Sequence, residues 1–197
     1  MRILALIGSP RTQSNTGTLV AEVVRGARSA GATCETINVC KIAIAPCKAC
    51  ETCERTGKCA QDDDMHAMYP KILDSDGFII GSPVYWWGPS AQMKTFLDRW
   101  YALIHRGGRS RFRGKKAVIV TAYGDDDPST SDHLVGMFRR SFEYLGIDIA
   151  GLLGVTASEP GEVLANTSAM KEAYDLGVQL ARMITARSSI RQREEGE

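Results

Sequence analysis

The sequence predicts one α/β domain with three layers, in which helices cover both faces of a five-stranded parallel sheet. Short apolar runs alternate along the chain with segments whose apolar residues recur at helical spacing. The 197 residues suffice for one domain with a sizeable core. Hydrophobic residues make up 44% and charged residues 24%, which is ordinary for a soluble globular protein and excludes a disordered chain.

Each expected element has a recognisable boundary. Pro70 disfavours a regular helix around it, and Ser90 is suited to cap a helix. The expected strands cover residues 2–7, 33–39, 77–80, 116–121 and 147–155. The expected helices cover residues 16–30, 62–74, 90–105, 129–145 and 166–187. This alternation favours the flavodoxin-like strand order 2-1-3-4-5, with a domain over 1–187 and a polar tail over 188–197.

Charge and hydropathy exclude several classes of partner. A net charge of +1 gives no electrostatic case for nucleic acid or an anionic membrane. No apolar run reaches the length of a membrane span. The chain starts directly with a strand pattern and without a cationic leader, so we expect a cytoplasmic protein whose thiols stay reduced.

Four cysteines form the sharpest motif of the chain. They have the spacing C-x2-C-x2-C-x5-C within a loop insertion over 43–62, and they are Cys47, Cys50, Cys53 and Cys59. Compact runs of cysteine hold iron–sulfur clusters. Zinc with four thiolates and a redox-active dithiol are the alternatives at this point. Four cysteines so close together argue against incidental thiols.

Ligands of such sheets bind beyond the carboxyl ends of the strands, so the loops after the first, third and fourth strands should form the site. The first loop, 8–16, opens a helix whose N-terminus favours an anion. It matches neither G-x-G-x-x-G nor the P-loop motif, so a single terminal phosphate fits best. An ordinary helix cap is the alternative. The candidate phosphate-binding residues are Ser9, Arg11, Ser14, Asn15 and Thr16.

The other two loops suit a flat ligand. Residues 81–90 contain three consecutive aromatic residues between glycines and prolines, and aromatic rings there suit a heterocycle. In the loop over 121–127, Thr121 and Gly124 let the backbone approach a ligand. The three acidic residues that follow are expected to be a solvated edge rather than a metal site.

Three segments together carry a resemblance to a known family. G-S-P-R-T-Q-S-N-T near the start and G-S-P-V-Y-W-W-G-P-S-A-Q-M-K-T-F-L-D-R at 81–99 resemble the NAD(P)H-dependent FMN reductase branch of the flavodoxin-like superfamily. With P-C-K-A-C-E-T-C-E-R-T-G-K-C-A-Q-D-D-D-M between them, the chain resembles in particular the iron–sulfur flavoproteins. The resemblance covers most of the chain, through the fourth strand at least.

This resemblance implies FMN, a [4Fe–4S] cluster and NAD(P)H as a possible co-substrate. The phosphate would be held by Ser9, Arg11, Ser14, Asn15 and Thr16. The isoalloxazine would be lined by Pro83, Val84, Tyr85, Trp86 and Gly88, with Thr121, Tyr123 and Gly124 on another edge. The cluster ligands would be Cys47, Cys50, Cys53 and Cys59. The resemblance also implies a homodimer or homotetramer, for which the helix 90–105 and the aromatic loop are the expected contact.

Two classes of function stay open on these grounds. One is a flavin oxidoreductase acting on a small molecule, and the other is an electron-transfer module that serves a ferredoxin-like carrier. A zinc- or thiol-based redox sensor is a third. No side chain is expected to act as acid or base, because the flavin carries the chemistry. The basic segment 106–116 is expected to be a solvated connector, with a mobile lid for an anionic substrate as the alternative.

Overall fold

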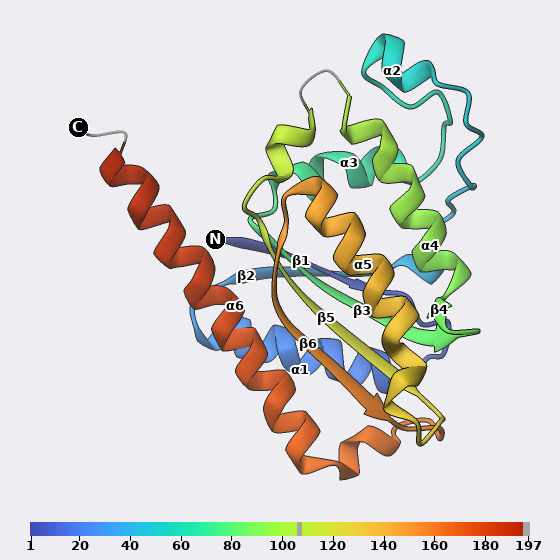
Figure 1. Ribbon diagram of the computed structural model, residues 1–197, viewed down its shortest axis with the longest axis vertical. Helices are drawn as coiled ribbons and strands as arrows, with labels where there is room; N and C mark the ends of the chain where they lie inside the picture. Colours follow the sequence, from blue (N-terminus) through green and yellow to red (C-terminus); the bar gives the residue numbers. More distant parts are fainter. Residues whose placement is uncertain (106–107, 195–197) are drawn as a thin grey trace.

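The computed structural model describes residues 1–105 and 108–194 and shows a three-layer α/β fold (Figure 1). The parallel strands pair in the order β2-β1-β3-β5-β6. Their bounds are β1 Arg2–Ile7, β2 Thr33–Asn38, β3 Gly77–Tyr85, β5 Lys116–Tyr123 and β6 Asp148–Thr156. The predicted order 2-1-3-4-5 is confirmed, because the additional strand β4, Gly88–Pro89, pairs only with β3 in an antiparallel hairpin.

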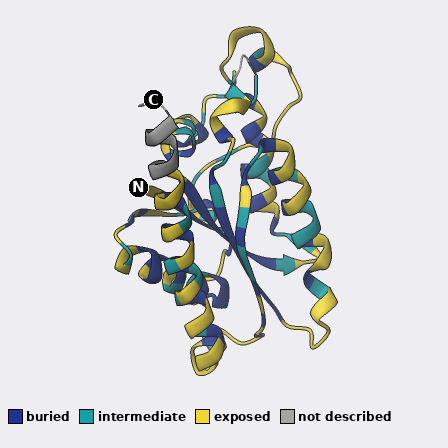
Figure 2. Cartoon of the chain, turned by 60° about the vertical axis from the view of Figure 1, so that its left-hand side comes forward, coloured by how far each residue is buried: buried dark blue, intermediate teal, exposed yellow. Residues whose placement is uncertain are grey.

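Helices pack on both faces of the sheet through two separate hydrophobic cores. Alternate residues of one strand face opposite layers, as in β1, where Ile3 packs with α1 and α6 while Leu4 packs with α3, α4 and α5. The central strands β1, β3 and β5 are therefore buried along most of their length, whereas the edge strands β2 and β6 are only partly buried (Figure 2). The helices are α1 Asn15–Ser29, α2 Thr52–Thr56, α3 Met65–Asp74, α4 Ala91–Asp98, α5 Asp132–Leu145 and α6 Thr167–Glu194.

Two strands are longer than the sequence predicts. The structure extends β3 from the predicted end at Ile80 to Tyr85, and β5 from Thr121 to Tyr123. Residues 81–83 keep parallel register with β5, so they form strand rather than an irregular loop. Gly81 is small for a packing reason, since a Cβ there would lie 2.3 Å from Val20 Cγ2 of α1.

Helix boundaries also differ from the predicted ones. Ser90 caps α4 as expected, because its hydroxyl accepts a hydrogen bond from the Met93 N–H at 3.2 Å. The expected helix over 90–105 then changes into a 3₁₀ helix, Arg99–Leu103, and the helix over 129–145 begins with another, Pro128–Ser131. The last helix continues to Glu194, past the predicted end at residue 187, because arginine, glutamine and glutamate favour helix.

The basic segment 106–116 is only partly the solvated connector that its charge predicts. Arg106 and Gly107 lie outside the described residues. Lys115 contradicts the expectation, since it is buried and its ammonium donates to the Ser75 carbonyl and, at 2.7 Å, to the Leu73 carbonyl. Burial lowers the pKa of Lys115 to about 8. Its physical role is to satisfy carbonyls at the end of α3.

Across the residues that the structure describes, no helix combines the length and the apolar character that crossing a membrane requires.

Helices α1 and α6 approach each other so closely that their contact requires glycine. A Cβ on Gly177 would lie 1.9 Å from the Val23 carbonyl oxygen, and a Cβ on Gly26 would lie 1.9 Å from the Tyr174 carbonyl oxygen. Backbone atoms cannot move aside as a flexible side chain can, so the two helices would have to separate.

We expect Gly177→Ala to lower the free energy of unfolding by about 1–3 kcal/mol, because it overpacks the contact between α1 and α6. Gly136→Ala is the matched control, since no atom lies within 4 Å of a Cβ at that helical position. The control should gain about 0.5–1 kcal/mol from its better helix propensity. Urea denaturation measures both variants, and two shifts of the same sign would contradict this account of the contact.

Candidate functional site

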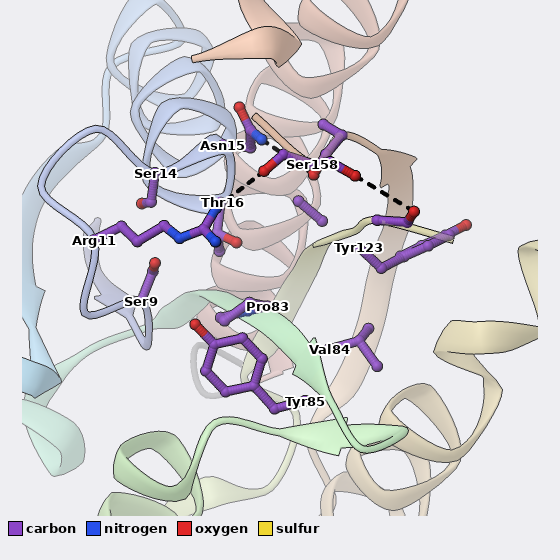
Figure 3. A pocket seen from close by; sticks show the side chains of 13 residues that line it. Ser9, Arg11, Ser14, Asn15, Thr16, Pro83, Val84, Tyr85, Tyr123 and Ser158 are labelled. Carbon is purple, nitrogen blue, oxygen red and sulfur yellow. Dashed lines mark hydrogen bonds between the residues drawn. The ribbon is translucent and has the colours of Figure 1, made fainter. Parts of the chain in front are cut away.

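A pocket with a volume of about 210 Å³ opens at the carboxyl edge of the sheet (Figure 3). The loop after β1, the carboxyl ends of β3 and β5, and Gly124 after β5 contribute to it, so the predicted segments meet here although part of them is strand. The segment after β6 also contributes, which the sequence analysis missed. The pocket is lined by Ser9, Arg11, Ser14, Asn15, Thr16, Pro83, Val84, Tyr85, Ala122, Tyr123, Gly124, Ala157 and Ser158. The topology therefore gathers most of the predicted ligand-binding residues into one place.

One side of this pocket is the N-terminus of α1. Ser14 caps the helix, with its hydroxyl accepting from the Gly17 N–H at 2.9 Å. The N–H groups of Asn15 and Thr16 belong to the first turn, where no acceptor within the helix exists. Arg11 adds a cation and donates to the Ser158 carbonyl at 3.0 Å. No carboxylate of the described residues lines this pocket, so it favours an anion.

The Asn15 side chain has a structural role that the sequence did not reveal. Its amide nitrogen donates to the Ala157 carbonyl at 3.2 Å and to the Glu159 carbonyl at 2.8 Å. Its amide oxygen accepts from the Val163 N–H at 3.2 Å. Both amide donors are thus used within the protein, which leaves the backbone N–H of Asn15 for a ligand. This side chain fixes the segment after β6 against the start of α1.

A second, more open hollow of about 530 Å³ adjoins the first and shares Val84, Tyr85, Tyr123 and Gly124 with it. It extends to Trp86, Trp87, Asp125 and Thr130. Trp86 and Trp87 form the turn between β3 and β4, and they have positive φ angles of 49° and 60°. Their exposed fractions are 91% and 51%. The aromatic segment is therefore a tight hairpin rather than a long irregular loop.

Two of the predicted flavin-site residues do not line either hollow. Thr121 is 1% exposed within β5, and its buried hydroxyl has no hydrogen-bond partner among the described residues. Gly88 pairs with Tyr85 in the hairpin. The missed residues Ala157 and Ser158 follow β6, and the sequence could have indicated them, because all parallel strands end at the same edge of the sheet.

The four motif cysteines line a separate cavity of about 310 Å³. Cys47 and Cys50 are exposed, Cys59 is half-buried and Cys53 is buried. In the described part of the chain, no three His, Cys, Asp or Glu side chains are placed to hold a single metal ion. The four thiols therefore share one cavity, but as placed they do not form a metal site.

The backbone and neighbouring donors favour the thiolate form of two of these cysteines, Cys50 and Cys59. A hydrogen bond from the Thr52 N–H lowers the pKa of Cys50. Burial raises the pKa of Cys59, but hydrogen bonds from Gln61, Tyr69 and Arg99 outweigh it, so the net shift is downward. Burial raises the pKa of Cys53. Left-handed backbone on both sides of Cys50, with φ of 51° at residue 49 and 55° at residue 51, is of the kind that gathers N–H groups around an anion.

A parallel sheet of this order, with an anion-favouring pocket and an aromatic rim at its carboxyl edge, defines a protein of the flavodoxin-like class. Residues 1–145 match the family described as NADPH-dependent FMN reductase, and the chain belongs to this family. It is therefore a flavin-dependent oxidoreductase, for which the family supports FMN and NAD(P)H.

Relatives of known name agree with this assignment. The chain is 38% identical to an iron–sulfur flavoprotein of Methanocaldococcus jannaschii, over 93% of this chain and 97% of that protein. It is 30% identical to an iron–sulfur flavoprotein of Archaeoglobus fulgidus, over 92% and 79% of the two chains. The solved NAD(P)H:quinone oxidoreductase of Methanothermobacter marburgensis shares the fold, with a TM-score of 0.69, 17% identity, and coverage of 91% of this chain and 96% of that one.

We expect Asn15→Ala to destabilise the protein by about 1–3 kcal/mol, because it leaves carbonyls and the Val163 N–H unpaired. Amide hydrogen exchange should become faster in residues 157–163. Asn38→Ala is the matched control, because its amide bonds Ser9 and Cys40 instead. If both variants accelerated exchange in residues 157–163 equally, Asn15 would not be the group that fixes this segment.

Proposed function

We propose that the carboxyl-edge pocket binds FMN, and that the protein moves electrons from NAD(P)H or a reduced carrier to a small-molecule acceptor with the assistance of a [4Fe–4S] cluster. One observation carries the flavin part of this proposal. A pocket free of carboxylates at the start of α1 continues directly into a hollow with an aromatic rim. A ligand with an anionic tail and a flat ring fits this arrangement, with the tail in the pocket and the ring in the hollow.

The pocket residues fit the two ends of FMN. Ser9, Arg11, Ser14, Thr16 and the Asn15 N–H would hold the phosphate, because they combine neutral donors with one cation. The ring would lie along Pro83, Val84, Tyr85, Trp86, Tyr123 and Gly124. We assign supporting roles to the two predicted residues that line neither hollow: Thr121 precedes the pocket residue Ala122 in β5, and Gly88 pairs with Tyr85 in the hairpin.

When bound, FMN supplies hydride acceptance from a reduced nicotinamide and electron release singly or in pairs. The chain positions the ring and excludes water from it with Val84 and Tyr123. Arg11 and the first turn of α1 balance the phosphate charge. Neither hollow is lined by a histidine of the described residues, and the proposal assigns no side chain as an acid or base.

For the cluster, the supporting observation is that four thiols line one cavity. Cys47, Cys50, Cys53 and Cys59 would be its ligands, and it would supply one-electron transfer.

This cavity also favours the second candidate function, an electron-transfer module that exchanges electrons with a ferredoxin-like carrier. Exposed Trp86 agrees with a homodimer or homotetramer that contacts through the hairpin.

We expect Arg11→Met to weaken FMN binding about tenfold, the value of one charge-assisted hydrogen bond at about 1.4 kcal/mol. Quenching of flavin fluorescence, titrated with FMN-free protein, measures the dissociation constant. Arg25→Met is the control, because Arg25 pairs with Glu22 on α1 and does not line the pocket. Unchanged affinity in Arg11→Met would place the phosphate elsewhere.

We expect Cys50→Ser to remove the broad absorbance near 400 nm, together with iron and acid-labile sulfide, and to leave the flavin bands. The measurement is anaerobic purification followed by a visible spectrum and metal analysis. Cys34→Ser is the control, because Cys34 packs in the core beside α1. Zinc without iron in the wild type would contradict the cluster and leave the flavin proposal standing.

Addition of NADPH to anaerobic protein separates the two candidate functions. Rapid bleaching of the flavin by NADPH alone is the result that we expect for the oxidoreductase. Bleaching that requires a reduced ferredoxin would favour the electron-transfer module.

A further inference from the structure

A buried arginine, Arg99, lies beside the cysteine cavity and belongs to none of the predicted sites. It is 1% exposed and begins the 3₁₀ helix after α4. One guanidinium nitrogen donates to the Ala45 carbonyl at 2.8 Å, and both terminal nitrogens contact the Asp63 carboxylate, one of them at 3.0 Å. The second nitrogen also donates to Cys59 Sγ at 3.4 Å. Thus one side chain contacts both ends of the cysteine loop and one of its sulfurs.

The two ends of this loop are joined by further hydrogen bonds that surround Arg99. Ala43 and Asp64 are bonded in both directions, from the Ala43 N–H to the Asp64 carboxylate at 2.7 Å and from the Asp64 N–H to the Ala43 carbonyl at 3.2 Å. The Ala45 N–H donates to Asp63 at 3.1 Å. We call residues 43–46 and 61–64 the loop base. Because Asp63 accepts from both Ala45 and Arg99, and Arg99 also donates to the Ala45 carbonyl, the arginine closes this network.

We propose that Arg99 is a positioning residue of the cysteine site, which holds the loop base together and raises the reduction potential of the bound cluster through its hydrogen bond to Cys59. The second part rests on the proposed cluster. Hydrogen bonds to ligating sulfurs stabilise the extra negative charge of the reduced cluster, so each one raises the potential. A guanidinium remains protonated at every pH at which the protein is folded, so this donor is permanent.

Another observation supports a bound group near this arginine. The Arg99 Nε–H is buried and has no acceptor among the described residues, although Arg99 lines the cysteine cavity. Buried donors without a partner are rare in proteins, and a bound ion or group is one of their explanations.

Tyr69 distinguishes the effect of Arg99 on the reduction potential from its role at the loop base. Its hydroxyl lies 3.5 Å from Arg99 and also bonds Cys59. No hydrogen bond of the described residues joins the Tyr69 hydroxyl to the loop base. Tyr69→Phe should therefore lower the potential and leave the loop base intact. Arg99→Gln should change both.

The first measurement is amide hydrogen exchange of cluster-free protein, so it does not depend on the cluster. In Arg99→Gln we expect exchange of the Ala43, Ala45 and Asp64 amides to accelerate at least tenfold. Because this variant leaves Asp63 without its cation, we add the double variant Arg99→Gln/Asp63→Asn, which removes both charges together and should also open the loop base. Arg140→Gln, which loses an exposed arginine paired with Glu143, is the control and should exchange as the wild type does.

The second measurement is an anaerobic redox titration after reconstitution with iron and sulfide. We expect the midpoint potential of the cluster to fall in Tyr69→Phe and further in Arg99→Gln, and iron retention against a chelator to drop about tenfold in Arg99→Gln. Arg99→Lys keeps the charge without the forked geometry, so it should restore only part of the retention.

These outcomes separate the two hypotheses. Wild-type protein that binds no iron and sulfide would overturn the cluster and with it the effect on potential, and the exchange data alone would then decide the role of Arg99 at the loop base. A wild type with its cluster, and Arg99→Gln with unchanged exchange and potential, would overturn the role of Arg99 and leave the proposed function standing.

Discussion

Parallel pairing of five strands is the constraint on which both candidate sites depend. It brings every strand's carboxyl end to one edge, where the ends of β3 and β5 meet the segments after β1, β5 and β6 although they are far apart in sequence. The same pairing makes α1 begin at this edge, so unpaired N–H groups of its first turn face the pocket. An anion-favouring site thus follows from the topology before any side chain is considered.

Polar side chains then fix the segments that the sheet leaves free. Asn15 ties the start of α1 to the segment after β6, and Arg99 ties the start and end of the cysteine loop to the helix that follows β4. Both side chains are almost fully buried. They bond mainly to backbone carbonyls or, for Arg99, to the Asp63 carboxylate, which in turn accepts a hydrogen bond from the Ala45 N–H. Each position is therefore intolerant of change for reasons of structure, whatever the ligand.

The sequence predicted the strand order, the Ser90 cap and most of the pocket residues, because apolar periodicity and local hydrogen bonding determine these features. It failed where a distant neighbour decides. Glycine is common in turns, yet Gly81 lies in a strand. It is glycine there because Val20 leaves no room for a side chain. Lys115 has the charge of a surface residue, yet two carbonyls at the end of α3 bind it in the interior. The role of Arg99 depends on partners more than thirty positions away.

The two tryptophans of the hairpin lower the stability of the fold, which a turn of other residues would not do. A bulky residue in the left-handed region is less stable by about 1–3 kcal/mol, and here two occur in succession. Asparagine and glycine are the residues that such a turn prefers. The backbone conformation that places two exposed indoles beside the second hollow therefore lowers stability, and selection for heat tolerance would favour Asn or Gly at these positions.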